Sequence, residues 1–262
     1  MLNIIVSIKQ VPDTTEVRID PVTNTLIREG VPVIINPFDE NAIEEGLRLR
    51  ERYGGKVTVI TMGPPQAENA LREALAMGVD DAILISDRNF AGADTLATSY
   101  TLACAIKKIG DFDVLLFGKQ AIDGDTAQVG PGVAEHLGIP EVAYVRKIEE
   151  INNGIAKVQR IMEDGSEIIE VQLPALFTVI KQINEPRLPS LKGKLMAKKK
   201  EIPVWKVEDI DADINKVGLK GSPTKVIKTF TPTPRGRGEI LKGTVDEQVS
   251  ELVTRLQELK LL

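Results

Sequence analysis

The sequence predicts an α/β fold: a doubly wound, mostly parallel β-sheet with an added antiparallel section and a C-terminal arm. Three observations predict it. Apolar runs alternate with helical patterns through the first half of the 262-residue chain, which is typical of βαβ units. After Pro140 the apolar runs follow one another with only turns between them. From about Asn184, prolines and glycines recur, so we expect an α/β domain at residues 1–183 and a C-terminal arm at residues 184–262.

The first half of the chain is predicted to contain four buried strands with helices between them. The first helix starts at Asn36-Pro37, because Asn is a favourable N-cap and Pro fits the first turn. Asp94 is a second expected N-cap. The polar stretch after the first strand is expected to form a hairpin from residues 17–20 and 25–29. Strands are expected at residues 2–8, 56–63, 81–86 and 113–118, and helices at residues 36–53, 64–78 and 94–109.

The second half changes in character. Residues 142–151, 155–173 and 174–183 are predicted to form consecutive strands, with a tight turn at Asn153-Gly154, at the edge of the sheet. The last segment, residues 245–262, repeats apolar side chains at helical spacing and is expected to form an amphipathic helix. An arm that ends in such a helix either folds back on its own sheet or lies on a partner subunit.

Composition excludes several classes of protein. The net charge of −5 argues against nucleic-acid binding, and no apolar run approaches the ~20 residues of a membrane span. No signal peptide is evident, and the single cysteine, Cys104, forms no internal disulfide, so we expect a cytoplasmic protein. Cys104 and the single histidine, His136, are interpreted as a small core residue and a helix-surface residue. No catalytic or metal-binding cluster is visible, so any redox chemistry requires a cofactor.

The segment GKQAIDGDTAQVGP, residues 118–131, is the most informative stretch of the chain. It follows the buried strand at residues 113–118 and leads into a helix expected to begin near Asp125. Ligands of doubly wound sheets bind at the carboxyl ends of strands, and free N–H groups at a helix start favour a phosphate. We therefore predict a nucleotide site here, although the segment matches neither the Rossmann nor the Walker fingerprint.

Several segments together resemble the beta subunit of electron transfer flavoproteins. They are IKQVPDT at residues 8–14, VIINPFDENAIEEGLRL at 33–49, the 118–131 segment, the strand–turn–strand from Val158 to Thr178, and NEPRLPSLKGKLMAKKKEIPV at 184–204. The resemblance covers essentially the whole chain at matching spacings. A universal-stress-type nucleotide-binding protein would account for the sheet, but not for the arm or for the pattern between Arg160 and Pro174.

The resemblance implies an alpha subunit as partner, which holds FAD and is embraced by the arm. In one branch of the family the beta subunit binds structural AMP. In the other it binds a second FAD that takes electrons from NADH and splits the pair. One electron goes to ferredoxin or flavodoxin, and the other reaches an acyl-CoA-type dehydrogenase through the alpha-subunit FAD. This chain resembles the second branch, because Gly124 and the Gly-Pro-Gly run at 130–132 leave room for a diphosphate and ribityl chain.

Roles in the loop follow from residue chemistry, whereas Ser7, Met62 and residues 36–39 are contacts that the resemblance implies. Thr126 and the neighbouring amides suit phosphate oxygens, whereas Asp123 and Asp125 are expected to cap the helix or accept from ribose hydroxyls. Lys9 is either a counter-charge or a solvated side chain, and Phe38 either approaches the flavin or packs the helix entry. The residues expected to bind the cofactor are Ser7, Asn36, Pro37, Phe38, Asp39, Met62, Ala121, Ile122, Asp123, Gly124, Asp125, Thr126, Ala127, Gln128, Val129, Gly130, Pro131 and Gly132.

Two further segments are expected to meet partners. Residues 191–200 combine apolar side chains with lysines and match the family's docking loop for dehydrogenases; a solvated basic run is the alternative. The PRGRGE stretch, with Arg235 and Arg237, is expected to approach either the alpha subunit or a flavin phosphate.

Overall fold

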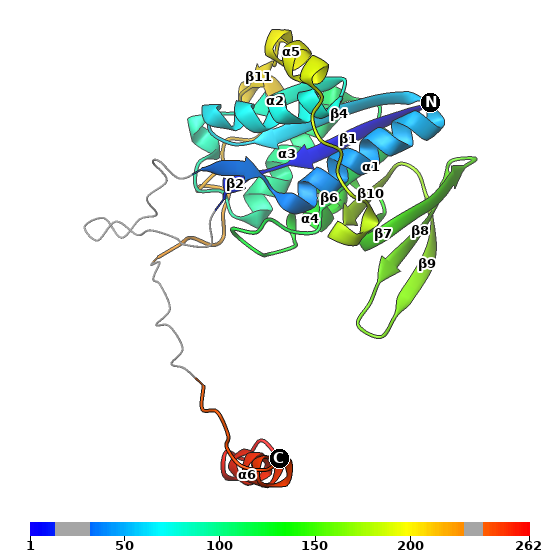
Figure 1. Ribbon diagram of the computed structural model, residues 1–262. Helices are drawn as coiled ribbons and strands as arrows, with labels where there is room; N and C mark the ends of the chain where they lie inside the picture. Colours follow the sequence, from blue (N-terminus) through cyan, green and yellow to red (C-terminus); the bar gives the residue numbers. More distant parts are fainter. Residues whose placement is uncertain (14–31, 228–237) are drawn as a thin grey trace.

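A computed structural model describes residues 1–13, 32–227 and 238–262 (Figure 1). Its main feature is a nine-stranded mixed sheet with the strand order β11-β5-β4-β1-β6-β10-β7-β8-β9. All neighbours from β11 to β7 are parallel, and β7, β8 and β9 are antiparallel. The strands are β1 (Leu2–Ile8), β4 (Gly55–Met62), β5 (Asp81–Ile85), β6 (Val114–Gly118), β7 (Glu141–Asn152), β8 (Ile155–Ile161), β9 (Ser166–Gln172), β10 (Ala175–Val179) and β11 (Val204–Trp205).

Helices cover both faces of the sheet, which confirms the predicted doubly wound fold. One apolar core joins α1 and α2 to one face, and a second core joins α3 and α4 to the other. Along β1, Ile4 and Val6 belong to the first core while Ile5 belongs to the second, so the strand is buried on both sides. The helices are α1 (Pro37–Tyr53), α2 (Glu68–Met77), α3 (Thr95–Ile109), α4 (Val129–Leu137), α5 (Leu191–Lys199) and α6 (Val245–Glu258).

Short elements complete the described chain. A separate two-stranded antiparallel ribbon follows β1 and precedes α1. The predicted hairpin of residues 17–20 and 25–29 lies outside the described residues. The short elements are β2 (Gln10–Pro12), β3 (Val33–Ile35) and the 3-10 helices η1 (Pro65–Ala67), η2 (Arg88–Phe90), η3 (Lys181–Ile183) and η4 (Glu208–Ile210).

Local sequence signals determine several element ends. The carboxylate of Asp94 accepts hydrogen bonds from the amides of Leu96 and Ala97, which confirms it as the N-cap of α3. Asn153 and Gly154 have φ of 49° and 74°, as a tight hairpin turn between β7 and β8 requires. The prediction for α4 was wrong by about one turn, because the helix begins at Val129 rather than near Asp125.

The strand β10 is not at the edge but lies between β6 and β7, parallel to both. All five of its residues are buried. The antiparallel section therefore consists of β7, β8 and β9, and extends from the body at lower right in Figure 1.

Residues after Asn184 follow two courses. The helix α5 packs on α2, where a Cβ on Gly193 would lie 2.2 Å from the carbonyl oxygen of Ala76, and β11 adds a parallel strand beside β5. The amphipathic helix α6 has no buried residue and lies apart from the α/β body in Figure 1. None of the helices in the described ranges combines the length and apolar character that crossing a bilayer requires.

Candidate functional site at the carboxyl edge of the sheet

The carboxyl ends of β1, β4 and β6 meet at one edge of the sheet, together with the start of α1. Ser7 pairs with Ile60 of β4 and Phe117 of β6, and only 6% of its surface is exposed. Met62 ends β4 and is half-buried. Because α1 runs antiparallel to the strands, its first residues reach the same edge, and the structure brings together the sequence-predicted residues from three distant segments.

Asn36 ties the start of α1 to the loop that follows β6. Its Nδ2 donates to the carbonyl oxygen of Gln120 at 2.8 Å, and its Oδ1 accepts from the amide of Ile122 at 3.2 Å. The side chain makes no capping hydrogen bond to its own helix. Asn36 therefore occupies the predicted N-cap position, but its buried amide group orders the 118–131 segment instead.

Asp39 links the ends of the two central strands. Its Oδ2 accepts from the backbone amide of Lys9 at 2.8 Å, and its Oδ1 accepts from the backbone amide of Gly118 at 3.1 Å. Burial raises the pKa of this carboxyl to about 7, although these hydrogen bonds, one from Asn36 and the charge of Lys9 oppose the shift. A Cβ on Gly118 would lie 2.2 Å from Asp39 Oδ1, so glycine is required there.

The loop of residues 119–128 is strongly turned, and its residues 122–126 are exposed. Asp125 and Ala127 have positive φ of 55° and 54°, a conformation that non-glycine residues rarely adopt and that is often associated with functional sites. Asp125 accepts a hydrogen bond from Gln120 and precedes α4 by a full turn, so it does not cap the helix.

The two charged side chains flanking the edge form an ion pair. Lys9 Nζ lies 2.7 Å from both carboxylate oxygens of Asp123. Both side chains are substantially exposed, so the pair contributes little to stability. Of the two sequence hypotheses for Lys9, the structure favours the counter-charge, and its partner is an aspartate of the chain itself.

The glycines of this segment differ in their surroundings. A Cβ on Gly130 would lie 2.6 Å from Thr178 Cγ2, and one on Gly132 would lie 2.8 Å from Ser99 Oγ. Both glycines therefore allow α4 to pack closely on β10 and α3, a reason that the sequence did not reveal. A Cβ on Gly124 would meet nothing within 4 Å, which leaves open space beside the exposed loop.

Phe38 lies beside Lys181, whose Nζ is 5.2 Å from the ring centroid. The ring is half-buried at the start of α1. Thr126 is exposed, and the first turn of α4 leaves backbone N–H groups without helical acceptors. Open space, free amides and a partly exposed aromatic ring are features that a nucleotide cofactor can use at a sheet edge.

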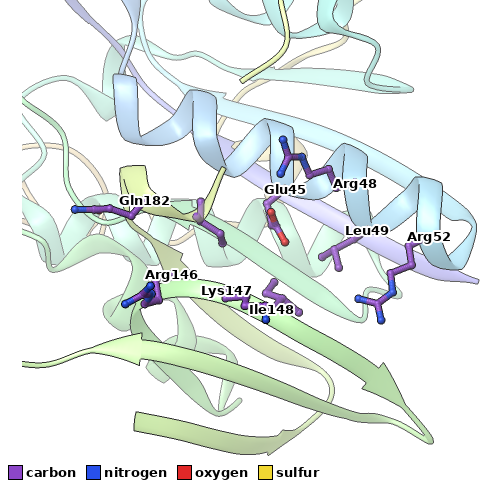
Figure 2. Close-up of a pocket in the computed structure, with 9 residues that line it drawn as sticks. Glu45, Arg48, Leu49, Arg52, Arg146, Lys147, Ile148 and Gln182 are labelled. Carbon is purple, nitrogen blue, oxygen red and sulfur yellow. The ribbon is translucent and has the colours of Figure 1, made fainter. Parts of the chain in front are cut away.

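A separate hollow of about 440 Å³ lies between the second half of α1, the middle of β7 and η3 (Figure 2). None of the residues predicted to bind the cofactor lines it. Figure 2 shows Arg48 and Arg52 of α1 on one side and Arg146 and Lys147 of β7 on the other, so its rim is basic.

Sequence reasoning missed three participants at the edge: Gly118, Gln120 and the carboxylate of Asp123 as a partner of Lys9. Gly118 bonds Asp39, and Gln120 bonds Asn36, through backbone groups, which leave no residue-type signal. The pairing of Lys9 with Asp123 joins residues 114 positions apart, and only the fold brings them together.

The fold and its edge geometry define a doubly wound α/β protein of the kind whose ligands bind at the carboxyl ends of parallel strands. An electron transfer flavoprotein domain model matches residues 23–210. The chain is 60% identical to the electron transfer flavoprotein subunit beta of Thermoanaerobacterium thermosaccharolyticum over 97% of this chain and 98% of that protein. It is 56% identical to the corresponding subunit of Clostridium acetobutylicum over 98% of each.

A further relative is subunit CarD of the caffeyl-CoA reductase-Etf complex of Acetobacterium woodii, 52% identical over 98% of each chain. The chain therefore belongs to the electron transfer flavoprotein family and is a beta-type subunit. This membership implies electron transfer together with an alpha subunit.

Proposed function

We propose that the chain binds FAD at the carboxyl edge of its sheet and transfers electrons from NADH by bifurcation. The accepting proteins are a ferredoxin or flavodoxin of low potential and, through the FAD of the alpha subunit, an acyl-CoA-type dehydrogenase. The observation that carries the proposal is the exposed, positive-φ loop of residues 119–128 with open space at Gly124, attached to the ends of β1 and β6.

The residues at the edge fit a dinucleotide. The first amides of α4 and the hydroxyl of Thr126 suit the diphosphate, and the absence of a Cβ at Gly124 allows the cofactor to approach the backbone. Phe38 offers an aromatic face near the same edge. FAD, when bound, supplies the capacity to accept two electrons from NADH and to release them singly.

Support for a dehydrogenase partner comes from the relative CarD, whose name places it in a complex with caffeyl-CoA reductase. The proposed docking surface is residues 191–200, which are the helix α5 and the residue that follows it. Leu191 is 78% exposed, Leu195 57% and Met196 62%, and four lysines on the same helix surround them. An apolar tip ringed by positive charge suits an acidic protein surface.

We further propose that α6 and the segment before it bind the alpha subunit, as part of an arm over residues 184–262. The apolar side chains of α6 share one helical face, and none of the described residues of this chain covers it: Val249 is 54% and Leu252 48% exposed. Such a face requires a partner. The stretch with Arg235 and Arg237 lies outside the described residues. We expect the heterodimer to work in the cytoplasm.

Anaerobic assays of the purified heterodimer test this function. NADH should reduce ferredoxin only when the dehydrogenase and its acyl-CoA-type acceptor are both present, because the favourable electron drives the unfavourable one. NADH-independent transfer through the alpha-subunit flavin alone would instead indicate a beta subunit that binds structural AMP.

A further inference from the structure

The ends of β1 and β6 flank the proposed cofactor site, and one side chain joins them. Asp39 Oδ2 receives the amide of Lys9, the first residue after β1, and Asp39 Oδ1 receives the amide of Gly118, the last residue of β6. Both bonds are backbone-to-carboxylate bonds between segments 30 and 79 residues apart. The carboxylate therefore fixes the separation and direction of the two strand ends.

A carboxylate suits this position better than an amide. It presents two acceptors to two N–H groups, whereas an Asn side chain would present one acceptor and one donor. Only 6% of Asp39 is exposed, so either amide left without its partner would be poorly compensated by water. The close approach of Gly118, where a Cβ would lie 2.2 Å from Oδ1, shows that the fit tolerates no added atom.

The end of β6 continues into the loop of residues 119–128, and the residue after β1 contacts this loop. The side chain of Lys9 pairs with Asp123, and the backbone of Gly118 leads directly into the loop. Asn36, one turn before Asp39, holds the loop at Gln120 and Ile122. A displacement of either strand end would therefore move the loop proposed to surround the nucleotide.

We propose that Asp39 is a positioning residue of the cofactor site, which acts through the Lys9 and Gly118 amides rather than by touching the cofactor, and that its ionised form is the one competent to bind FAD. This inference rests on the proposed function. The contact of Asp39 with the two strand-end amides is then pH-dependent, and it orders the loop before the cofactor binds.

Burial makes this contact sensitive to physiological pH. The pKa of Asp39 is raised to about 7, so the carboxylate predominates at pH 8 and the neutral acid below pH 6. Of the charged groups in the described ranges, the charge of Lys9 acts on Asp39 and lowers its pKa. Lys9 lies on the β1 side, Lys119 follows Gly118 on the β6 side, and on α1 the next residue, Glu40, is influenced by Glu73 and Lys181.

The test measures FAD affinity of the nucleotide-stripped heterodimer at pH 6 and pH 8 by calorimetric titration. Asp39→Asn is compared with Glu40→Gln, a matched control at the next residue of α1. The control is suitable because the backbone amides of Lys9 and Gly118 donate hydrogen bonds to Asp39 and not to Glu40. At pH 8, Asp39→Asn should weaken binding at this chain's site by about tenfold or more, consistent with one hydrogen bond to a charged group. At pH 6 the difference should shrink, because wild-type Asp39 is then largely neutral.

Thermal unfolding separates positioning from a structural defect. Asp39→Asn removes a buried charge but leaves one strand-end amide without an acceptor, so the two effects offset each other in part. Its melting temperature at pH 8 should stay close to that of the wild type while its FAD affinity falls. A second measurement needs no variant: FAD does not titrate between pH 6 and pH 8, and wild-type affinity should fall several-fold on acidification.

Equal or tighter FAD binding by Asp39→Asn at pH 8, or a wild-type affinity independent of pH, would overturn the inference while leaving the proposed function intact. A wild-type heterodimer that takes up no FAD on this chain would instead overturn the proposed function, and this inference with it.

Discussion

Two glycines of the proposed cofactor edge have opposite surroundings, and they give a matched pair of substitutions. Gly118→Ala should destabilise the fold, by about 1–3 kcal/mol, because its Cβ would press on Asp39 and Phe38 at 2.2 to 2.8 Å. Gly124→Ala should leave the free energy of unfolding nearly unchanged, because its Cβ meets nothing within 4 Å. Denaturant unfolding of both variants measures the difference, and equal losses would show that the contact at Gly118 relaxes freely.

The buried Asp39 should also make the free energy of unfolding depend on pH. Its pKa rises from 3.8 to about 7 on folding, mainly through burial, so the folded chain binds a proton that the unfolded chain has released. This contribution is complete below about pH 4 and is lost as pH rises through 7. Each pKa unit corresponds to about 1.4 kcal/mol, which sets a scale of a few kcal/mol.

Relative to Asp39→Asn, the wild-type chain should therefore lose stability between pH 5 and pH 8. Urea unfolding at a series of pH values measures this difference. Parallel pH curves for the two proteins would contradict the account of a buried, titrating carboxyl.

At the scale of elements, α1 also holds the segment that leads to the proposed docking helix. Arg187 donates through Nε at 2.8 Å to Glu44 of α1. It also pairs with Glu51, two helical turns after Glu44. The Glu44 side chain is only 3% exposed. Burial by itself raises the pKa of Glu44, but hydrogen bonds from Arg187 and Arg48 hold it below its ordinary value.

Arg187→Ala should lower the free energy of unfolding by about 1–3 kcal/mol. The loss is smaller than that expected from breaking a fully buried ion pair, because the Arg187 side chain is 34% exposed. Arg48→Ala is the control, since it removes an exposed i,i+4 partner of the same carboxylate, worth about 0.5 kcal/mol. Because the pKa of Glu44 is lowered on folding, the pair stabilises the protein above about pH 4.5, and its contribution is lost on further acidification. Thermal melts at pH 7 and pH 4 test both statements.

Local sequence signals predicted most strands and helices of the body, including the helix start at Asn36-Pro37 and the cap at Asp94. The position of β10 was not predicted, because an apolar pattern identifies a buried strand but not its neighbours. In the structure all five of its residues are buried, as is typical of a central parallel strand. The start of α4 was misplaced because Asp125 resembles a cap, whereas positive φ at Asp125 and Ala127 delays the helix.

Most of the predicted site residues lie at one edge of the sheet, because strand ends and loop glycines are visible in a sequence; that they bind a cofactor stays a prediction. Its internal connections were not, because they join distant residues through backbone groups. Asn36 was expected to cap a helix and instead binds Gln120 and Ile122. Gly130 and Gly132 were expected to make room for a cofactor, and packing against Thr178 and Ser99 already requires them to be small.

At the scale of the whole molecule, the unpartnered face of α6 should determine assembly rather than folding. The double substitution Val249→Asp and Leu252→Asp should leave the melting temperature of the chain unchanged, because both side chains are about half exposed. It should abolish the complex with the alpha subunit in size-exclusion chromatography. The exposed Glu251→Gln is the control, and a loss of complex with this variant would point to charge rather than apolar contact.

Counting the bound nucleotides shows whether the carboxyl edge of this sheet binds FAD. The chain is co-expressed with its alpha subunit, the complex is denatured, and the released nucleotides are separated by chromatography. The account predicts two FAD and no AMP for each heterodimer. One FAD and one AMP would contradict it, and would assign to this chain a structural nucleotide, with the electrons passing through the alpha subunit alone.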